Sequence, residues 1–70
     1  MMETLHEMLR QRPFQPFRIV LTSGDKYDVH HPDLVVVMLS QVFVAELRSD
    51  RSHFLRLNQI AALESLREAA

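Results

Sequence analysis

Residues 17–29 hold the feature that most constrains the fold, because apolar alternation flanks the only glycine of the chain, Gly24. Apolar side chains occupy every second position on both sides of it, at Phe17, Ile19 and Leu21 and then at Tyr27 and Val29. A period of two is typical of half-buried strands, and glycine readily adopts the positive φ that a tight turn needs. The pattern therefore predicts a β-hairpin.

The same pattern selects the register of this hairpin. A three-residue loop with Gly24 in the left-handed conformation places Ile19 opposite Tyr27 and keeps the apolar face continuous. A two-residue loop would instead place Ile19 opposite Asp28 and divide that face. We therefore predict the three-residue loop.

Size and composition predict one small domain that gains stability by self-association. The chain has 70 residues, 47% of them hydrophobic, and it has no cysteine. A domain this small has a marginal core, which neither a disulfide nor a thiolate metal site can supplement here. Large apolar patches are rare on monomers. We therefore expect a single domain, residues 1–70, that forms a homo-oligomer by pairing of edge strands.

Charge and hydropathy favour a cytoplasmic protein with no membrane partner. The net charge is −1, so the basic character of a typical nucleic-acid-binding domain is missing from the chain as a whole. No apolar run approaches the roughly 20 residues of a membrane span. The first residues lack the apolar core and the cleavage site of a signal peptide.

A short helix precedes the hairpin, and further strands follow it. Residues 3–11 show helical spacing of apolar side chains, with Thr4 in the position of an N-cap. After Pro32, residues 34–39 are apolar at every position, as expected of a strand buried on both faces. Residues 42–48 and 53–57 predict two more strands.

The last segment, residues 58–66, has two readings. An Asn58-capped helix would place Ile60, Leu63 and Leu66 on one side, and the Ala, Leu and Glu content favours helix. The alternative is a short closing strand.

Two segments resemble the Sm-like small β-barrels, the group that includes Sm and Lsm proteins, Hfq and Rof. Residues 19–24, IVLTSG, resemble the opening of the first Sm motif, and residues 55–60, LRLNQI, resemble the second motif. The resemblance implies a mainly β fold: a short N-terminal helix at 3–11, a barrel of about five strongly bent antiparallel strands within 17–66, and a tail at 67–70. It also favours a closing strand at the end of that barrel.

A second resemblance supplies no activity. The RPFQPF segment at 12–17 and the HPD segment at 31–33 resemble a family of small bacterial proteins.

For function, the Sm-like resemblance implies RNA binding, but few motif positions are retained. Leu57 stands where the second motif has glycine, and Arg56 and Asn58 alone match nucleotide-contacting positions. Arg18 and Tyr27 add a charge and a stacking surface. We therefore predict a non-enzymatic, oligomerising module that binds single-stranded RNA through these four residues.

The alternative is a protein-interaction module of the Rof type without RNA binding. Its candidate contacts are Asp25, Asp28 and Asp33, which would face a basic protein partner.

Catalysis, metals and cofactors are not expected. His30 and His31 are neighbours whose side chains diverge, and His6 lacks the second histidine of the zinc-protease pattern. A site would need Asp33 or His53, or a second subunit, to reach the four ligands that zinc prefers. One glycine cannot form a phosphate-binding loop, and the serines lie in predicted turns.

Overall fold

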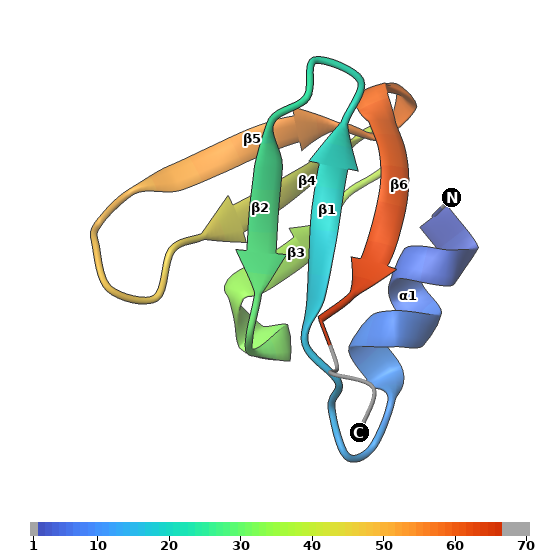
Figure 1. Ribbon diagram of the computed structural model, residues 1–70, viewed down its shortest axis with the longest axis vertical. Coiled ribbons are helices and arrows are strands. Elements are labelled where there is room, and N and C mark those ends of the chain that lie inside the picture. Colours follow the sequence, from blue (N-terminus) through green and yellow to red (C-terminus); the bar gives the residue numbers. More distant parts are fainter. Residues whose placement is uncertain (1, 67–70) are drawn as a thin grey trace.

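The computed structural model describes residues 2–66, which form one α-helix, six strands and two 3-10 helices (Figure 1). The expected tail at 67–70 lies outside the described residues. The regular elements are α1 (Met2–Arg10), β1 (Phe17–Leu21), β2 (Lys26–Val29), β3 (Val35–Val37), β4 (Gln41–Ala45), β5 (Ser52–Arg56) and β6 (Ile60–Ser65), with 3-10 helices at Pro32–Leu34 and Leu57–Gln59.

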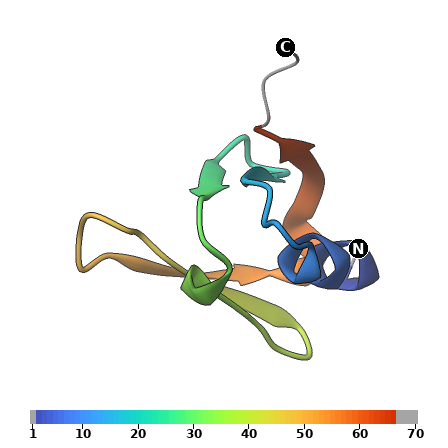
Figure 2. The ribbon, with the colours of Figure 1, turned by 90° about the horizontal axis from the view of Figure 1, so that it is seen from below.

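The six strands form two three-stranded antiparallel sheets. Sheet A has the order β2-β1-β6 and sheet B the order β3-β4-β5. The two sheets pack face to face, sheet B lying behind sheet A in the view of Figure 1, and α1 occupies the corner on the β6 side (Figure 2). The fold is mainly β with an N-terminal helix, as predicted. Strand pairing among the described residues does not join the two sheets into one closed barrel.

The predicted hairpin and its register are confirmed. Ile19 pairs with Tyr27, and Phe17 pairs with Val29. The Leu21 N–H donates to the carbonyl of Asp25 at 2.9 Å, which closes a three-residue loop. Gly24 has a φ of 95°, the left-handed conformation that the loop requires.

The core lies between the inner faces of the two sheets and includes one residue of the helix. Phe14 packs against it, with its ring centroid 6.1 Å from that of Phe17. The buried set alternates along the strands, and its members are Leu5, Phe17, Ile19, Val29, Val35, Val42, Val44, Leu55 and Ile60. Removal of these side chains from water holds the sheets and the helix together.

The helix starts earlier than predicted. It spans Met2–Arg10, so Thr4 lies inside the helix and is not its N-cap. Glu3 in the first turn and Arg10 in the last turn complement the helix dipole. Leu5 is fully buried, which docks the short helix on the core.

The prediction of one two-sided buried strand at 34–39 is wrong. A 3-10 helix occupies Pro32–Leu34, because proline fits its first turn and the Val35 N–H donates to the carbonyl of Pro32. The strand that follows has three residues, Val35–Val37, and Val36 is 54% exposed. The observed strand is therefore shorter than the predicted one, and one of its two faces is exposed to solvent. The count is six strands, where about five were predicted.

Residues 60–65 form a strand, so the helix that their composition favours is not adopted. Strand β6 pairs with β1 from Leu21–Ile60 to Phe17–Ser65, with a bulge after Val20. The Leu66 N–H donates to the carbonyl of Pro16 at 3.0 Å. The free edge of β1 thus overrides the helical preference of this segment.

Candidate functional site

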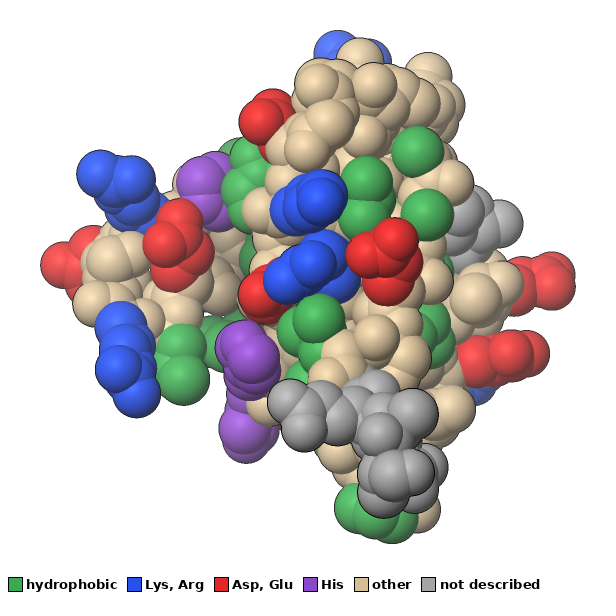
Figure 3. Space-filling view, viewed as in Figure 1, with side chains coloured by type: hydrophobic (Ala, Val, Ile, Leu, Met, Phe, Trp, Pro, Cys, Tyr) green, Lys and Arg blue, Asp and Glu red, His purple; other side chains and the backbone are tan. Residues whose placement is uncertain are grey.

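A groove of about 1090 Å³ separates the β2 edge of sheet A from the projecting end of the β4–β5 hairpin. The hollow is visible beside the charged surface of sheet A (Figure 3). The lining from sheet A consists of Arg18, Lys26, Tyr27, Asp28 and His30, and the remaining lining consists of Leu34, residues 44–49 and His53.

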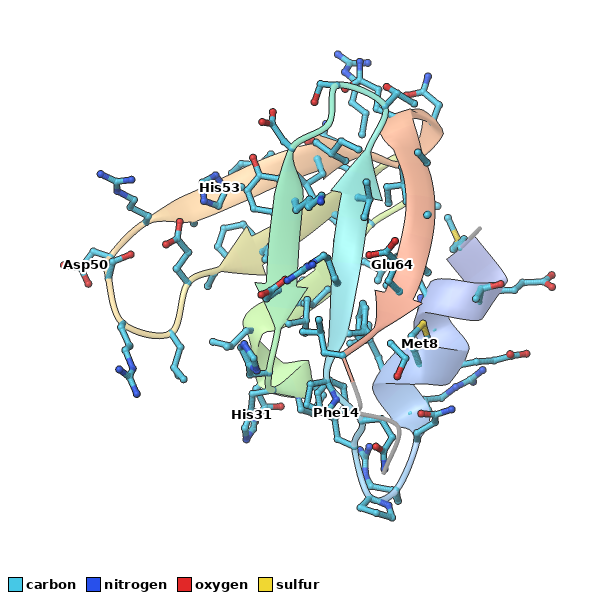
Figure 4. The ribbon with its side chains drawn as sticks, in the orientation of Figure 1. Met8, Phe14, His31, Asp50, His53 and Glu64 are labelled. Carbon is cyan, nitrogen blue, oxygen red and sulfur yellow. The ribbon has the colours of Figure 1, made fainter. Side chains whose placement is uncertain are left out.

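The groove contains a tilted aromatic pair that links its two walls. The Tyr27 and His53 rings lie 4.6 Å apart at 48°, and Figure 4 shows His53 beside the sheet A strands. Nε2 of His53 lies 2.6 Å from Oε2 of Glu46, across the hairpin. Leu34 adds apolar surface to the lining, Leu47 is 64% exposed, and Val44 lies buried at the base of the groove.

Two carboxylates of the groove are held by partners within the chain. Arg18 Nε donates to Asp28 at 2.7 Å, and its Nη2 donates to the second carboxylate oxygen at 3.3 Å. This bidentate hydrogen bond lowers the pKa of Asp28 and raises the pKa of Arg18. The hydrogen bond with His53 likewise lowers the pKa of Glu46. Both carboxylates are therefore charged and already partnered at neutral pH.

Two cations of the groove lack such partners. Among residues 2–66, neither Lys26 nor Arg48 forms a salt bridge. Lys26 lies on the same outer face as Arg18 and Asp28 because their positions alternate in the register. The groove therefore presents unpaired positive charge beside apolar surface.

The backbone of β2 also faces the groove side. In an antiparallel ladder, hydrogen-bonded residue pairs alternate with pairs that share no hydrogen bond. Leu21 and Asp25 form a hydrogen-bonded pair, so Ile19–Tyr27 and Phe17–Val29 are hydrogen-bonded as well. Lys26 and Asp28 then direct their N–H and C=O groups away from β1. Within the described part of the chain, β2 has no strand on that side.

The predicted RNA-contacting residues are divided between two places. Arg18 and Tyr27 line the groove, but Arg56 and Asn58 do not. Arg56 ends β5 and Asn58 lies in the Leu57–Gln59 3-10 helix. The guanidinium of Arg18 is occupied by Asp28.

The predicted acidic contacts are also separated. Asp28 lines the groove, whereas Asp25 and Asp33 do not. Asp25 lies in the hairpin turn, where its carboxylate accepts from the Ser23 hydroxyl at 3.1 Å. Asp33 lies in the 3-10 helix, 3.6 Å from Nδ1 of His31. These local contacts explain the turn positions of both residues.

Sequence reasoning missed the contribution of the β4–β5 hairpin to this site. Residues 46–48 belong to a strand predicted from the sequence, and no residue of 46–52 is among the predicted contacts. The one usable signal was Leu47, an apolar side chain beside the turn. The approach of Glu46 to His53 depends on strand pairing and gives no local pattern.

No cluster of metal-ligating side chains occurs among residues 2–66. In the same part of the chain, no helix has the length and apolar character to cross a membrane.

Comparison of the chain with protein-family models, with curated proteins and with solved structures finds no match. The groove is therefore interpreted from its own chemistry.

Proposed function

We propose that the chain is a non-enzymatic protein-interaction module whose groove receives a segment of a partner protein. The observation that carries the proposal is the groove between β2 and the β4–β5 hairpin, which combines exposed apolar lining with unpaired charge. Interfaces need both: apolar surface for affinity, and charged groups at the rim for orientation.

The opposite side of the molecule supports this interpretation. There α1 occupies the corner beside β6 and contributes the fully buried Leu5 to the core (Figure 2). On the groove side no element of the described chain fills the corresponding space, and Leu47 stays 64% exposed. The groove is the part of the fold in which an added segment would bury apolar surface.

A selection from a phage-displayed library of random linear peptides tests the proposal. We expect peptides that bind the wild-type chain and lose about tenfold or more in affinity with Leu47→Glu, which places a charge at the groove. The matched control is Leu39→Glu, because Leu39 is 93% exposed and is not part of the groove lining.

The control variant should bind as the wild type does. Failure to enrich any peptide, or equal binding by the two variants, would contradict the proposal. Titration with a labelled single-stranded RNA provides the competing outcome: binding that falls steeply with salt and is lost in Arg56→Ala would favour the RNA prediction.

Self-association stays a prediction, and exposed apolar side chains on sheet B favour it. Val36, Phe43 and Phe54 are cross-strand neighbours in one row on its outer face. Val36 is 54% and Phe54 is 64% exposed. A second copy that paired at the β5 edge of sheet B would continue both the sheet and this apolar row.

An Sm-like barrel also stays a proposal. Pairing of the first strand, β1, with the last, β6, supports it, as does the 3-10 helix directly before β6. An experimental structure of the chain would test whether the two sheets close.

A further inference from the structure

We propose that the partner segment binds as an added antiparallel strand on the β2 edge, and that it alternates apolar and acidic residues. This inference rests on the proposed function and specifies the chemistry of the partner at the same groove.

Within the described chain, the backbone of β2 has unpaired hydrogen-bonding groups along its outer edge. Lys26 and Asp28 each direct one N–H and one C=O group away from β1, toward the side on which the groove lies. An extended peptide can satisfy all of these groups at once, as in strand addition to other open sheet edges. A helical partner cannot, because its own backbone groups are bonded internally.

The other sheet edges are less suitable. In β3 the Val35 N–H already donates to Pro32, so its three-residue edge has lost a donor. The β6 edge lies beside α1 (Figure 1). On the β5 edge, the residues whose backbone N–H and C=O groups point away from β4 are Ser52, Phe54 and Arg56, and none of them lines the groove.

Side-chain alternation gives the pattern of the partner. In an added strand, one set of side chains continues the inner face of Tyr27 and meets the apolar lining at Leu34. The other set continues the outer face, beside Lys26 and Asp28. The first set should therefore be apolar.

Charge gives the chemistry of the second set. Asp28 is already neutralised by Arg18, and Glu46 is bonded to His53, whereas Lys26 and Arg48 have no salt bridge within residues 2–66. Opposite charges across neighbouring strands attract, and like charges repel. Acidic side chains therefore complement this edge, and basic ones do not.

The probe for the first experiment is a synthetic peptide, acetyl-SEVEVES-amide, titrated into the 15N-labelled full chain. We expect saturable binding and slower amide hydrogen exchange at Lys26 and Asp28, because the peptide carbonyls accept from these N–H groups. Replacing each glutamate of the peptide with lysine should weaken binding by about tenfold or more.

Backbone methylation of the same peptide separates strand addition from other modes. Only alternate residues of an added strand direct their N–H groups to β2. For an antiparallel strand, N-methylation of the glutamates should reduce affinity by about tenfold or more, while N-methylation of the valines leaves it near the parent value. Equal effects of the two modified peptides would overturn the inference.

A pair of variants tests the edge from the side of the protein. Lys26→Pro removes the outward N–H without breaking a bond to β1, and Lys26→Ala removes only the charge. We expect Lys26→Pro to bind the peptide more weakly than Lys26→Ala does. If Lys26→Pro fails to fold, the methylated peptides decide the question.

The outcomes distinguish the two proposals. Some peptides from the random library could depend on Leu47 for binding but leave the amide hydrogen exchange of Lys26 and Asp28 unchanged. This result would overturn strand addition but would still support the protein-interaction module. If no peptide depends on Leu47 for binding, both proposals are wrong.

Discussion

Sheet A and sheet B have similar apolar inner faces but differ on the faces that they turn to solvent. The outer face of sheet A carries the Arg18–Asp28 pair, with Lys26 and Glu64 on neighbouring strands. The outer face of sheet B carries the apolar row of Val36, Phe43 and Phe54 (residues paired across three strands).

This difference separates what folding requires from what it leaves open. Both inner faces must be apolar because they form the only core of the described chain. An outer face has no such requirement, and polar side chains there favour solubility. The apolar row on sheet B thus adds nothing to the core, which is why we assign it to self-association.

The largest effect should distinguish two phenylalanines, one from each kind of face. Phe17 is fully buried on the inner face of β1, and Phe54 is 64% exposed on β5. Phe17→Ala should lower the free energy of unfolding by about 3 to 5 kcal/mol, because it leaves a cavity. Phe54→Ala should cost about 1 kcal/mol, from loss of its contact with Phe43.

Chemical denaturation of the two variants measures both values. Equal losses would show that the outer face of sheet B contributes to the core and would remove the contrast between the faces.

A second test concerns the mass of the protein in solution. If the apolar row drives association, Phe54→Asp should shift the chain from oligomer to monomer in light scattering, because the interface would bury an unpaired charge. Leu47→Asp is a matched control, since both side chains are 64% exposed and Leu47 lies in the groove instead. A monomeric wild type would contradict the prediction.

The smallest effect concerns the charged face of sheet A and its response to pH. The Arg18 hydrogen bond lowers the folded-state pKa of Asp28 below its ordinary value of 3.8. The stabilisation is thus fully present above the unfolded-state pKa and is lost in the acidic range, as the pH falls from the unfolded-state pKa through the folded-state pKa. Asp28→Asn should have a shallower loss of thermal stability over this range.

Glu46 has a lowered pKa as well, so part of the acid dependence should persist in Asp28→Asn. Identical pH profiles for Asp28→Asn and the wild type would show that the ion pair has no effect on stability.

Local patterns were sufficient for the part of the fold that depends on neighbouring residues. Alternation around Gly24 predicted the hairpin with its register and loop, because a shift by one residue would have moved the fully buried Val29 out of the core. The same reasoning failed at 34–39, where an unbroken apolar run does not reveal which face a second layer will cover. It left 58–66 undecided because strand pairing with β1 overrides local propensity.

The candidate site was less predictable than the fold. Tyr27, Arg18 and Asp28 were selected from sequence, but for two different functions, and the structure places them in one groove. The partners of those charges, and the approach of the β4–β5 hairpin, depend on contacts between segments far apart in the chain.

The sequence by itself determined the hairpin, the N-terminal helix and the mainly β class, because these follow from periodicity and from the conformational freedom of one glycine. Tertiary structure alone decided that α1 fills one corner between the sheets and that the other remains a groove. The physical reason is that a groove arises from the relative placement of two sheets, and no local sequence pattern encodes the space between them.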